Sequence, residues 1–388
     1  MQGRKYLRAM LLVCIFVLLI LVPSNAVDAV TQDRVFLDLS LDFLGEYKLP
    51  KMDFMNTPVG GFSAITYDRR RDRFLAVSDD TNQYAPARFY TLKITLNSTS
   101  ESKINIENVE LESVTILTDK NGQTAKGTII PKGIALTPEQ TVFISGYTAA
   151  KNRIVPFIQE FDINGKMLQS IPIPKRYLSD AIDDKPTEDI QQTSAFESLT
   201  FNPTGTIPTS GEPVNLFTTT SPVVQDQEPL SSDKSDPIRF LHYLIGYGSP
   251  VLIAEYFYPI DPTSDDATLN GLVELLSVDR GGHFLSLERT KEQSGFHEKI
   301  FQITTGGATD ISRIDSLKGE IKGIRPIKKK LLLDLNQLGI TLGDLQAMAF
   351  GRRLKDGTQS LVLVSNDQQT TQFLLFRLST KSKAMGFS

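Results

Sequence analysis

The chain has 388 residues, a formal net charge of −4 at pH 7 and a single cysteine. This length suits one large domain or two smaller ones, and its 40% apolar and 22% charged residues are ordinary for a globular protein. The slight negative charge, without a basic stripe, argues against nucleic acid as the main partner.

The N-terminus predicts a cleaved export signal rather than a part of the fold. Basic residues among the first eight positions precede an uninterrupted apolar run at residues 10–22. Small side chains then flank a cleavage site after Ala26, so we expect a signal peptide at residues 1–26. The alternative is an uncleaved anchor, but the apolar run is short for a membrane span. We therefore expect no membrane span in the mature chain.

The only cysteine, Cys14, lies inside that apolar run. A mature chain without cysteine has no disulfide, no thiolate metal site and no cysteine nucleophile. An exported protein without disulfides suits a bacterial-type envelope. We therefore predict a periplasmic or extracellular location.

Apolar runs typical of β-strands recur along the rest of the chain. Residues 35–49 alternate apolar and polar side chains, as a half-buried strand does. Five units then follow, each with a short apolar run, a turn and a second apolar run. The paired runs are 61–67 with 74–80, 132–136 with 142–147, 197–201 with 215–220, 271–278 with 283–289, and 345–350 with 360–365.

This repeat predicts an all-β fold, a β-propeller at residues 35–380. The units start about 65–75 residues apart, which leaves room for two further strands in each. We count five blades, and six is the alternative because long insertions could hide one. The last unit lacks an outer strand, which residues 35–49 can supply. That N-terminal strand would close the last blade and hide an open sheet edge.

The same stretches resemble a known family. The sequence is similar to the phytase-like domain of bacterial proteins described as "esterase-like activity of phytase", over roughly residues 35–380. The resemblance is carried by residues 61–80, 132–136, 195–201, 272–290 and 344–367. It implies an exported propeller that hydrolyses phosphate or carboxylic esters of small molecules, with a metal-binding site at the axis.

Several acidic positions of the family pattern differ in this chain. The family carries a glutamate before glycine at the start of the inner strands. Here Lys132 stands in the second unit and Gln346 in the last, while the third unit keeps Glu197 but follows it with serine. Calcium prefers six to eight oxygen ligands, several of them anionic. We therefore expect Ca²⁺, the cofactor that the resemblance suggests, to bind weakly or not at all, with Lys132 pairing with a nearby carboxylate.

The retained carboxylates are the candidates for catalysis and metal binding. The resemblance implies acid–base roles for Glu197, Asp79 and Glu288, and metal ligation by Asp79, Asp80 and Asp367. Adjacent strand residues point to opposite faces, so one of the Asp79–Asp80 pair can face a ligand while the other caps the turn. The alternative is that both only solvate a loop. Glu197 could equally accept backbone N–H groups from the next blade.

Two cations are candidates for binding a phosphate group. Arg289 and Lys132 would hold phosphate oxygens, since a planar guanidinium matches that geometry. A structural ion pair between blades is the commoner role for a Glu288–Arg289 sequence. The chain contains no Gly-x-Ser-x-Gly elbow and no P-loop.

Two functions of different class follow. The first is an exported phytase-like or esterase-like hydrolase, with a phosphate ester favoured over a carboxylic ester as substrate. The second is a propeller that has lost catalysis and serves as a binding or scaffold module of the envelope.

Overall fold

The computed structural model describes residues 35–380 except 81–83, 101–102, 125–127, 151–152, 179–193, 204–211, 223–237, 247, 265, 316, 318–322 and 368. The chain divides into two compact units, Met1–Leu37 and Asp38–Ser388. The predicted signal peptide, residues 1–26, lies outside the described residues. Within the described part of the chain, no helix is long and apolar enough to cross a membrane.

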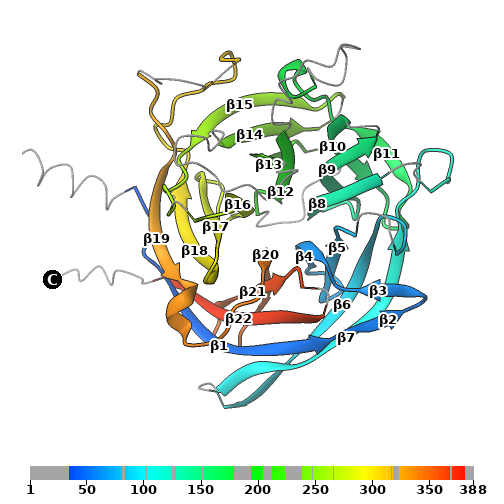
Figure 1. The fold of residues 1–388 in the computed structure, drawn as a ribbon, viewed down its shortest axis with the longest axis vertical. Coiled ribbons are helices and arrows are strands. Elements are labelled where there is room, and N and C mark those ends of the chain that lie inside the picture. Colours follow the sequence, from blue (N-terminus) through cyan, green and yellow to red (C-terminus); the bar gives the residue numbers. More distant parts are fainter. Residues whose placement is uncertain are drawn as a thin grey trace, which may run out of the picture. The chain divides into compact units, whose positions relative to one another are not determined.

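The second unit is a five-bladed β-propeller, in which five four-stranded antiparallel sheets surround a common axis (Figure 1). From the axis outward, blade 1 contains β4 (Phe62–Asp68), β5 (Arg73–Ser78), β6 (Arg88–Ser100) and β7 (Lys103–Ile116). Blade 2 contains β8 (Thr128–Leu136), β9 (Val142–Ala150), β10 (Arg153–Phe161) and β11 (Met167–Ser170). Blade 3 contains β12 (Ser194–Phe201), β13 (Val214–Pro222), β14 (Ile238–Ile245) and β15 (Val251–Tyr258).

Blade 4 contains β16 (Leu269–Ser277), β17 (His283–Glu292), β18 (Gly295–Thr304) and β19 (Lys328–Asp334). Blade 5 contains β20 (Leu345–Arg353), β21 (Gln359–Ser365), β22 (Thr370–Thr380) and β1 (Leu39–Pro50). A hairpin of β2 (Met52–Phe54) and β3 (Thr57–Val59) precedes blade 1, and the short 3₁₀ helices are η1 (Lys175–Tyr177) and η2 (Leu335–Leu338). The all-β propeller and its count of five blades are confirmed.

The N-terminal strand closes the circle. β1 pairs antiparallel with β22 along its whole length, from Leu39 opposite Thr380 to Pro50 opposite Thr370. The last blade therefore combines three strands from the end of the chain with one from its beginning, as predicted. This pairing covers the edge of β22 that would otherwise expose unpaired N–H and C=O groups.

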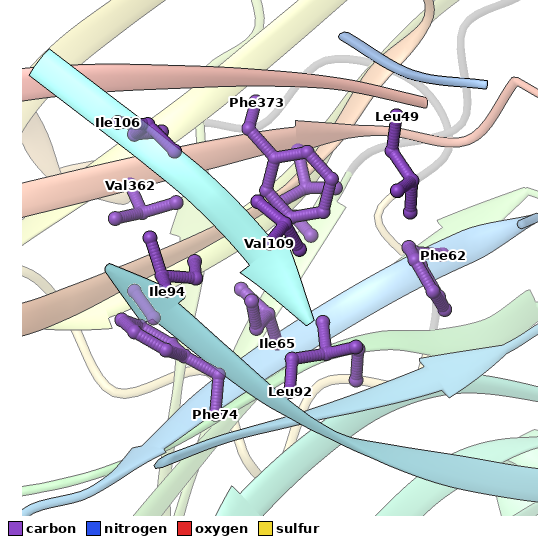
Figure 2. Packing of buried hydrophobic residues seen from close by; sticks show 14 of the residues in the cluster. Leu49, Phe62, Ile65, Phe74, Leu92, Ile94, Ile106, Val109, Val362 and Phe373 are labelled. Atoms are coloured by element: carbon purple, nitrogen blue, oxygen red, sulfur yellow. The ribbon is translucent and has the colours of Figure 1, made fainter. Parts of the chain in front are cut away.

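The hydrophobic core lies between neighbouring blades. One cluster joins blade 5 to blade 1, and Figure 2 shows Val362 and Phe373 from the last blade beside Ile65 and Phe74 from the first. Equivalent clusters join blades 1 and 2, blades 2 and 3, and blades 3 and 4. Burying one such large apolar side chain contributes about 1.5–3 kcal/mol. The alternating apolar positions of each strand thus fix its two faces against the two adjacent blades.

Aspartates form the tight turns that follow several strands. In the turn from β4 to β5, Asp68 accepts the Arg70 N–H at 2.9 Å, and Asp72 adopts a left-handed backbone with φ of 54°. In the turn from β16 to β17, Asp279 accepts the N–H groups of Gly281 and His283. Such side-chain bonds mimic a backbone turn and favour the chain reversal.

The five inner strands share an irregularity near their starts. In β4, β8, β12, β16 and β20 the pairing with the second strand shifts register, as in a β-bulge. The residues inside the five shifts are Ser63, Lys132, Glu197 with Ser198, Val273, and Gln346. Bulges change the direction of side chains and are common beside functional sites.

The inner strands contact one another in a closed cycle around the axis, β4 to β8 to β12 to β16 to β20 and back to β4. Equivalent residues lie side by side, because Ser63 Oγ donates to the carbonyl of Pro131 and Thr66 Oγ1 accepts the Leu136 N–H. The strands therefore run in the same direction along the axis. We call the end where they begin the start end, and the opposite end the far end.

Candidate functional site

The start end of the axis collects most of the predicted site residues, because each inner strand begins there and each second strand finishes there. Asp79 directly follows β5 of blade 1, and its Oδ2 lies 3.2 Å from Lys132 Nζ of blade 2. The same Oδ2 accepts a bond of 2.8 Å from Asn366 Nδ2 of blade 5. One carboxylate therefore links three consecutive blades.

Lys132 pairs with a carboxylate, as its position predicted. Its side chain is 16% exposed at the bulge of β8. Burial lowers the pKa of Lys132, but the charges of Asp79 and Glu197 raise it, and the net pKa lies above its ordinary value. The Tyr147 pKa is also raised, by burial first, although Lys132 lowers it. Lys132 therefore carries a positive charge, which the carboxylates of Asp79 and Glu197 stabilise.

Glu197 lies half-buried at the bulge of β12, beside Lys132 of the preceding blade. Its negative charge also acts on Glu274, in β16 of the following blade. Glu274 is only 2% exposed. Burial raises the pKa of Glu274 well above its ordinary range, the N–H groups of Leu275 and Met348 lower it, and Glu197 raises it. Two glutamates on neighbouring blades therefore differ in environment, one beside a cation and one desolvated.

Glu274 occupies a special place among the inner strands. The equivalent residues of the other four are all small, namely Ala64, Gly133, Ser198 and Ala347. The Glu274 carboxylate accepts the Leu275 N–H at 3.0 Å, and the N–H of Met348 in blade 5 also bonds to it. It therefore fills a space at the axis and joins blade 4 to blade 5.

Together these residues form a polar ring around the start end. We use this name for Asn366, Asp79, Lys132, Glu197 and Glu274, which come from blades 5, 1, 2, 3 and 4 in turn. The bond of Glu274 to blade 5 completes the circle.

A second charged cluster adjoins the ring at blades 4 and 5. Arg289 of β17 donates to Asp344 Oδ1, and Gln346 Nε2 donates to Asp344 Oδ2 at 3.0 Å. The Asp344 N–H in turn bonds to Asp367 Oδ2 at 3.2 Å. The Asn366 N–H bonds to the Asp344 carbonyl at 2.7 Å, so this cluster and the polar ring share a loop.

Beneath this cluster lies a buried acid, Glu298 of β18, which is opposite Arg289 in the strand register. Its Oε1 accepts the Leu345 N–H at 2.7 Å, while Oε2 is buried without a hydrogen-bond partner among the described residues. Burial raises the pKa of Glu298 to about 9, the Leu345 N–H lowers it, and Asp344 raises it. Glu298 is therefore protonated at neutral pH.

Asp80 points away from Asp79, as strand alternation predicts. Its Oδ2 forms an ion pair of 2.9 Å with Arg88 Nη1, and the two side chains are 5% and 1% exposed. Arg88 also donates to Tyr90 Oη and to the Pro58 carbonyl. Asp80 thus anchors the hairpin and the third strand of blade 1, and its role as a metal ligand remains a prediction.

Glu288 faces the neighbouring blade rather than the axis cluster of Arg289. Its Oε1 accepts bonds from Tyr258 Oη of blade 3 at 2.6 Å and from Lys329 Nζ of β19 at 2.7 Å. Burial raises the pKa of Glu288, and Lys329 lowers it. Lys329 also pairs with Asp261 at 2.7 Å. The Glu288–Lys329 ion pair therefore lies within blade 4, and the Tyr258 hydrogen bond ties it to blade 3.

The arrangement of carboxylates does not fit a calcium site. Within the described residues, no group of three or more His, Cys, Asp or Glu side chains is placed to hold a metal ion. Of the three predicted ligands, Asp79 is bound to Lys132, Asp80 to Arg88, and Asp367 to a backbone N–H. Calcium needs several anionic oxygens converging on one point, whereas these three carboxylates are each held by a different partner.

Sequence reasoning missed Glu274, Glu298 and the pairing of Asp344 with Arg289. Glu274 could have been found by aligning the five inner strands. The other four strands carry a small residue at its position, and Glu274 alone is large. Glu298 carries no such signal, because it lies in an ordinary run of the third strand of its blade.

The fold and the ring define a class, a five-bladed propeller with acidic and basic residues of all blades gathered at one end of its axis. The chain belongs to the phytase-like family. The family model, described as esterase-like activity of phytase, matches residues 57–368. This match confirms the resemblance seen in the sequence, and a search of curated proteins found no match.

Solved structures with a related arrangement are distant. A putative glycoside hydrolase from Parabacteroides distasonis is 10% identical over 88% of this chain and 97% of that one, with a TM-score of 0.42. A glycosyl hydrolase from Bacteroides ovatus is 10% identical over 81% and 83%, with a TM-score of 0.40. Hydrazine synthase from Kuenenia stuttgartiensis is 11% identical over 81% and 79%, with a TM-score of 0.33.

Proposed function

We propose that the protein is an exported hydrolase of phosphate esters that works at the start end of the axis. One observation supports this most, the neighbouring placement of Lys132 and Glu197 at the bulges of two consecutive inner strands. A fixed ammonium beside a half-buried carboxylate provides a site for a phosphoryl oxygen and a group that can accept a proton. Family membership supports the same reaction class.

In this proposal Lys132 binds a phosphoryl oxygen and Arg289 adds a second cation from blade 4. Glu197 removes a proton from the attacking water, whose oxygen forms the new bond to phosphorus as the ester P–O bond breaks. The leaving alkoxide takes its proton from solvent. Asp79, held by Asn366, keeps the Lys132 ammonium in place and charged. Of the predicted catalytic carboxylates, Glu288 is assigned a supporting role, because it is bonded to Tyr258 and Lys329.

We infer that calcium is not required for this reaction. Asp79 already pairs with Lys132 and Asp344 with Arg289, so a divalent cation would have to displace an ammonium or a guanidinium from either carboxylate. Calcium at micromolar concentration should leave the melting temperature unchanged. A rise of several degrees would show that a calcium site exists.

The hydrolysis of p-nitrophenyl phosphate and p-nitrophenyl acetate by the purified protein tests the proposal. We expect turnover of the phosphate ester with or without EGTA, and a loss of about 100-fold or more in kcat for Glu197→Gln. Glu107→Gln is the matched control, since Glu107 is exposed on the outer strand β7. Equal turnover by Glu197→Gln and the unmodified protein would refute the role of Glu197.

The second candidate is a propeller without catalysis that binds or scaffolds other components of the envelope. It is favoured by one observation, the existing ion pairs of Asp79, Asp80, Glu288 and Arg289, which leave few charged groups for chemistry. Inorganic phosphate distinguishes the two functions. Binding of phosphate that is lost in Lys132→Met, without hydrolysis of either ester, would favour the binding module.

A further inference from the structure

A separate cavity opens at the far end of the axis. Its volume is about 710 Å³, and all five inner strands contribute to its wall. Among the described residues, none of the polar ring and none of the predicted catalytic, substrate or metal residues lines it. The cavity is therefore a feature that the proposed hydrolytic site does not use.

The wall of this cavity combines apolar and polar side chains. Equivalent positions of the five inner strands border it with apolar side chains that are themselves buried in the core, namely Ile65, Ile134, Leu199, Leu275 and Met348. Nearer the mouth, Leu136, Phe201 and Phe350 are only half-buried. Partly exposed large apolar side chains inside a concave surface favour an apolar ligand.

Some backbone N–H groups on the inner edges of the inner strands already have a hydrogen-bond acceptor within the protein. Thr66 Oγ1 accepts the Leu136 N–H at 3.4 Å, and Thr200 Oγ1 accepts the Ser277 N–H at 3.0 Å. Each bond runs from one blade to the next, at equivalent positions. Amide groups that already have partners require neither water nor polar ligand atoms, so the cavity can accept an apolar body at lower cost.

The mouth of the cavity is positively charged. Arg69 and Arg353 line it and are both exposed. The acidic residue Asp356 also lines it, but Arg377 Nε lies 3.0 Å from its Oδ2 and balances its charge. Arg353 Nη1 donates to the Gly357 carbonyl at 2.8 Å, and its other N–H groups can meet a ligand together with Arg69. Guanidinium groups bind carboxylate and phosphate oxygens well.

We propose that the far-end cavity is a binding site for an amphipathic anion. The apolar chain of the ligand lies against the half-buried Leu136, Phe201 and Phe350, and its carboxylate or phosphate head meets Arg69 and Arg353. A volume of about 710 Å³ lies within the usual range for small-molecule sites. This site is independent of the proposed hydrolysis, because the two lie at opposite ends of the axis.

Isothermal titration calorimetry of the purified protein with decanoate, decyl phosphate and uncharged decanol tests this site. We expect saturable binding of at least one anion at one molecule per chain, and binding of decanol that is weaker by about tenfold or more. The double variant Arg69→Gln/Arg353→Gln should weaken anion binding by a similar factor. Arg70→Gln, a neighbouring exposed arginine that does not line the cavity, should leave it unchanged.

Two further variants separate the cavity from other sites. Phe201→Asp puts a carboxylate on the half-buried apolar part of the wall and should abolish anion binding, and the arginine variant decides the question if that protein does not fold. Lys132→Met, at the start end, should bind decanoate normally. The proposal fails if neither anion binds saturably, if the double arginine variant binds both anions as well as the unmodified protein, or if Lys132→Met loses decanoate binding.

Discussion

The two ends of the propeller axis are built from the same five strands and have opposite chemistry. At the start end, bulges place Ser63, Lys132, Glu197, Val273 and Gln346, so every blade offers a different side chain. At the far end, equivalent positions of all five strands are apolar and buried, and the ends of the strands surround one cavity. A bulge releases a side chain from the regular alternation of a strand, whereas regular pairing holds the next residues in the core. The side chains at the far end are thus alike in all five blades, whereas those at the start end differ from blade to blade.

The largest expected loss in the free energy of unfolding follows substitution of Asp80, and the matched comparison is its neighbour Asp79 at the start end. Asp80→Ala leaves Arg88 as a buried charge without its carboxylate, which should reduce the free energy of unfolding by about 3–5 kcal/mol. Asp79→Ala breaks a more exposed pair and should cost about 1 kcal/mol. Urea unfolding at pH 7 measures both. Equal losses would show that the axis pair is as structural as the buried one.

The buried acids of the start end should make stability depend on pH. The pKa of Glu298 is raised to about 9 by burial, so the folded protein holds a proton that the unfolded chain releases. Its stabilising contribution is complete below the ordinary pKa of a glutamate and is lost as the pH rises towards about 9. Each such group lowers the free energy of unfolding by up to about 1.4 kcal/mol per pH unit. The pKa of Glu274 is raised in the same direction.

Glu298→Gln keeps an oxygen for the Leu345 N–H and removes the titration. Urea unfolding between pH 6 and pH 8 should then show a decline that is smaller by about 2–3 kcal/mol than in the unmodified protein. Glu107→Gln, on an exposed position of β7, is the control and should leave the decline unchanged. An unaltered decline in Glu298→Gln would mean that this carboxyl is ionised in the folded state.

The inner strands of blades 2 and 3 lie so close together at the start end that Gly133 has no room for a side chain. A Cβ there would lie 2.5 Å from Ser145 Oγ and 2.9 Å from the Glu197 carbonyl oxygen. Gly133→Ala should therefore reduce the free energy of unfolding by about 1–3 kcal/mol, because blade 3 must move outward. Gly246→Ala is the control, since its nearest atom would lie at an ordinary 3.4 Å. A neutral Gly133→Ala would show that the blades can separate locally at the bulge.

The sequence allowed most of the fold to be predicted, and less of the site. Strand alternation and turns repeat in every unit, so the five blades and the closing strand 35–49 could be predicted from the sequence. The separation of Asp79 from Asp80 followed from alternation as well. Contacts between blades did not follow, because Arg289 and Asp344 are 55 residues apart and meet only through the curvature of the propeller.

The cavity escaped prediction for a similar reason. Each inner strand reads as an apolar run, and nothing in one run indicates that five of them leave a common space. The bulges escaped too, since a register shift depends on the partner strand. Glu274 shows the limit most clearly, because an acidic residue within an apolar run looks like a solvated position until its equivalents on the other blades are compared.

The smallest expected effect compares one ion pair from each end. Lys132 and Asp79 at the start end are 16% and 18% exposed, whereas Arg352 and Asp72 at the far end lie 3.7 Å apart and are 55% and 50% exposed. Water and salt screen the exposed pair, so Arg352→Ala should change the free energy of unfolding by less than about 0.5 kcal/mol. That change should vanish in 1 M NaCl, while the loss in Lys132→Ala should persist, because its partner Asp79 is shielded from solvent. Urea unfolding at low and high salt measures the difference. If both losses in the free energy of unfolding vanish in 1 M NaCl, the start end is as accessible to water as the far-end rim. The shielded Lys132–Asp79 ion pair described above would then be wrong.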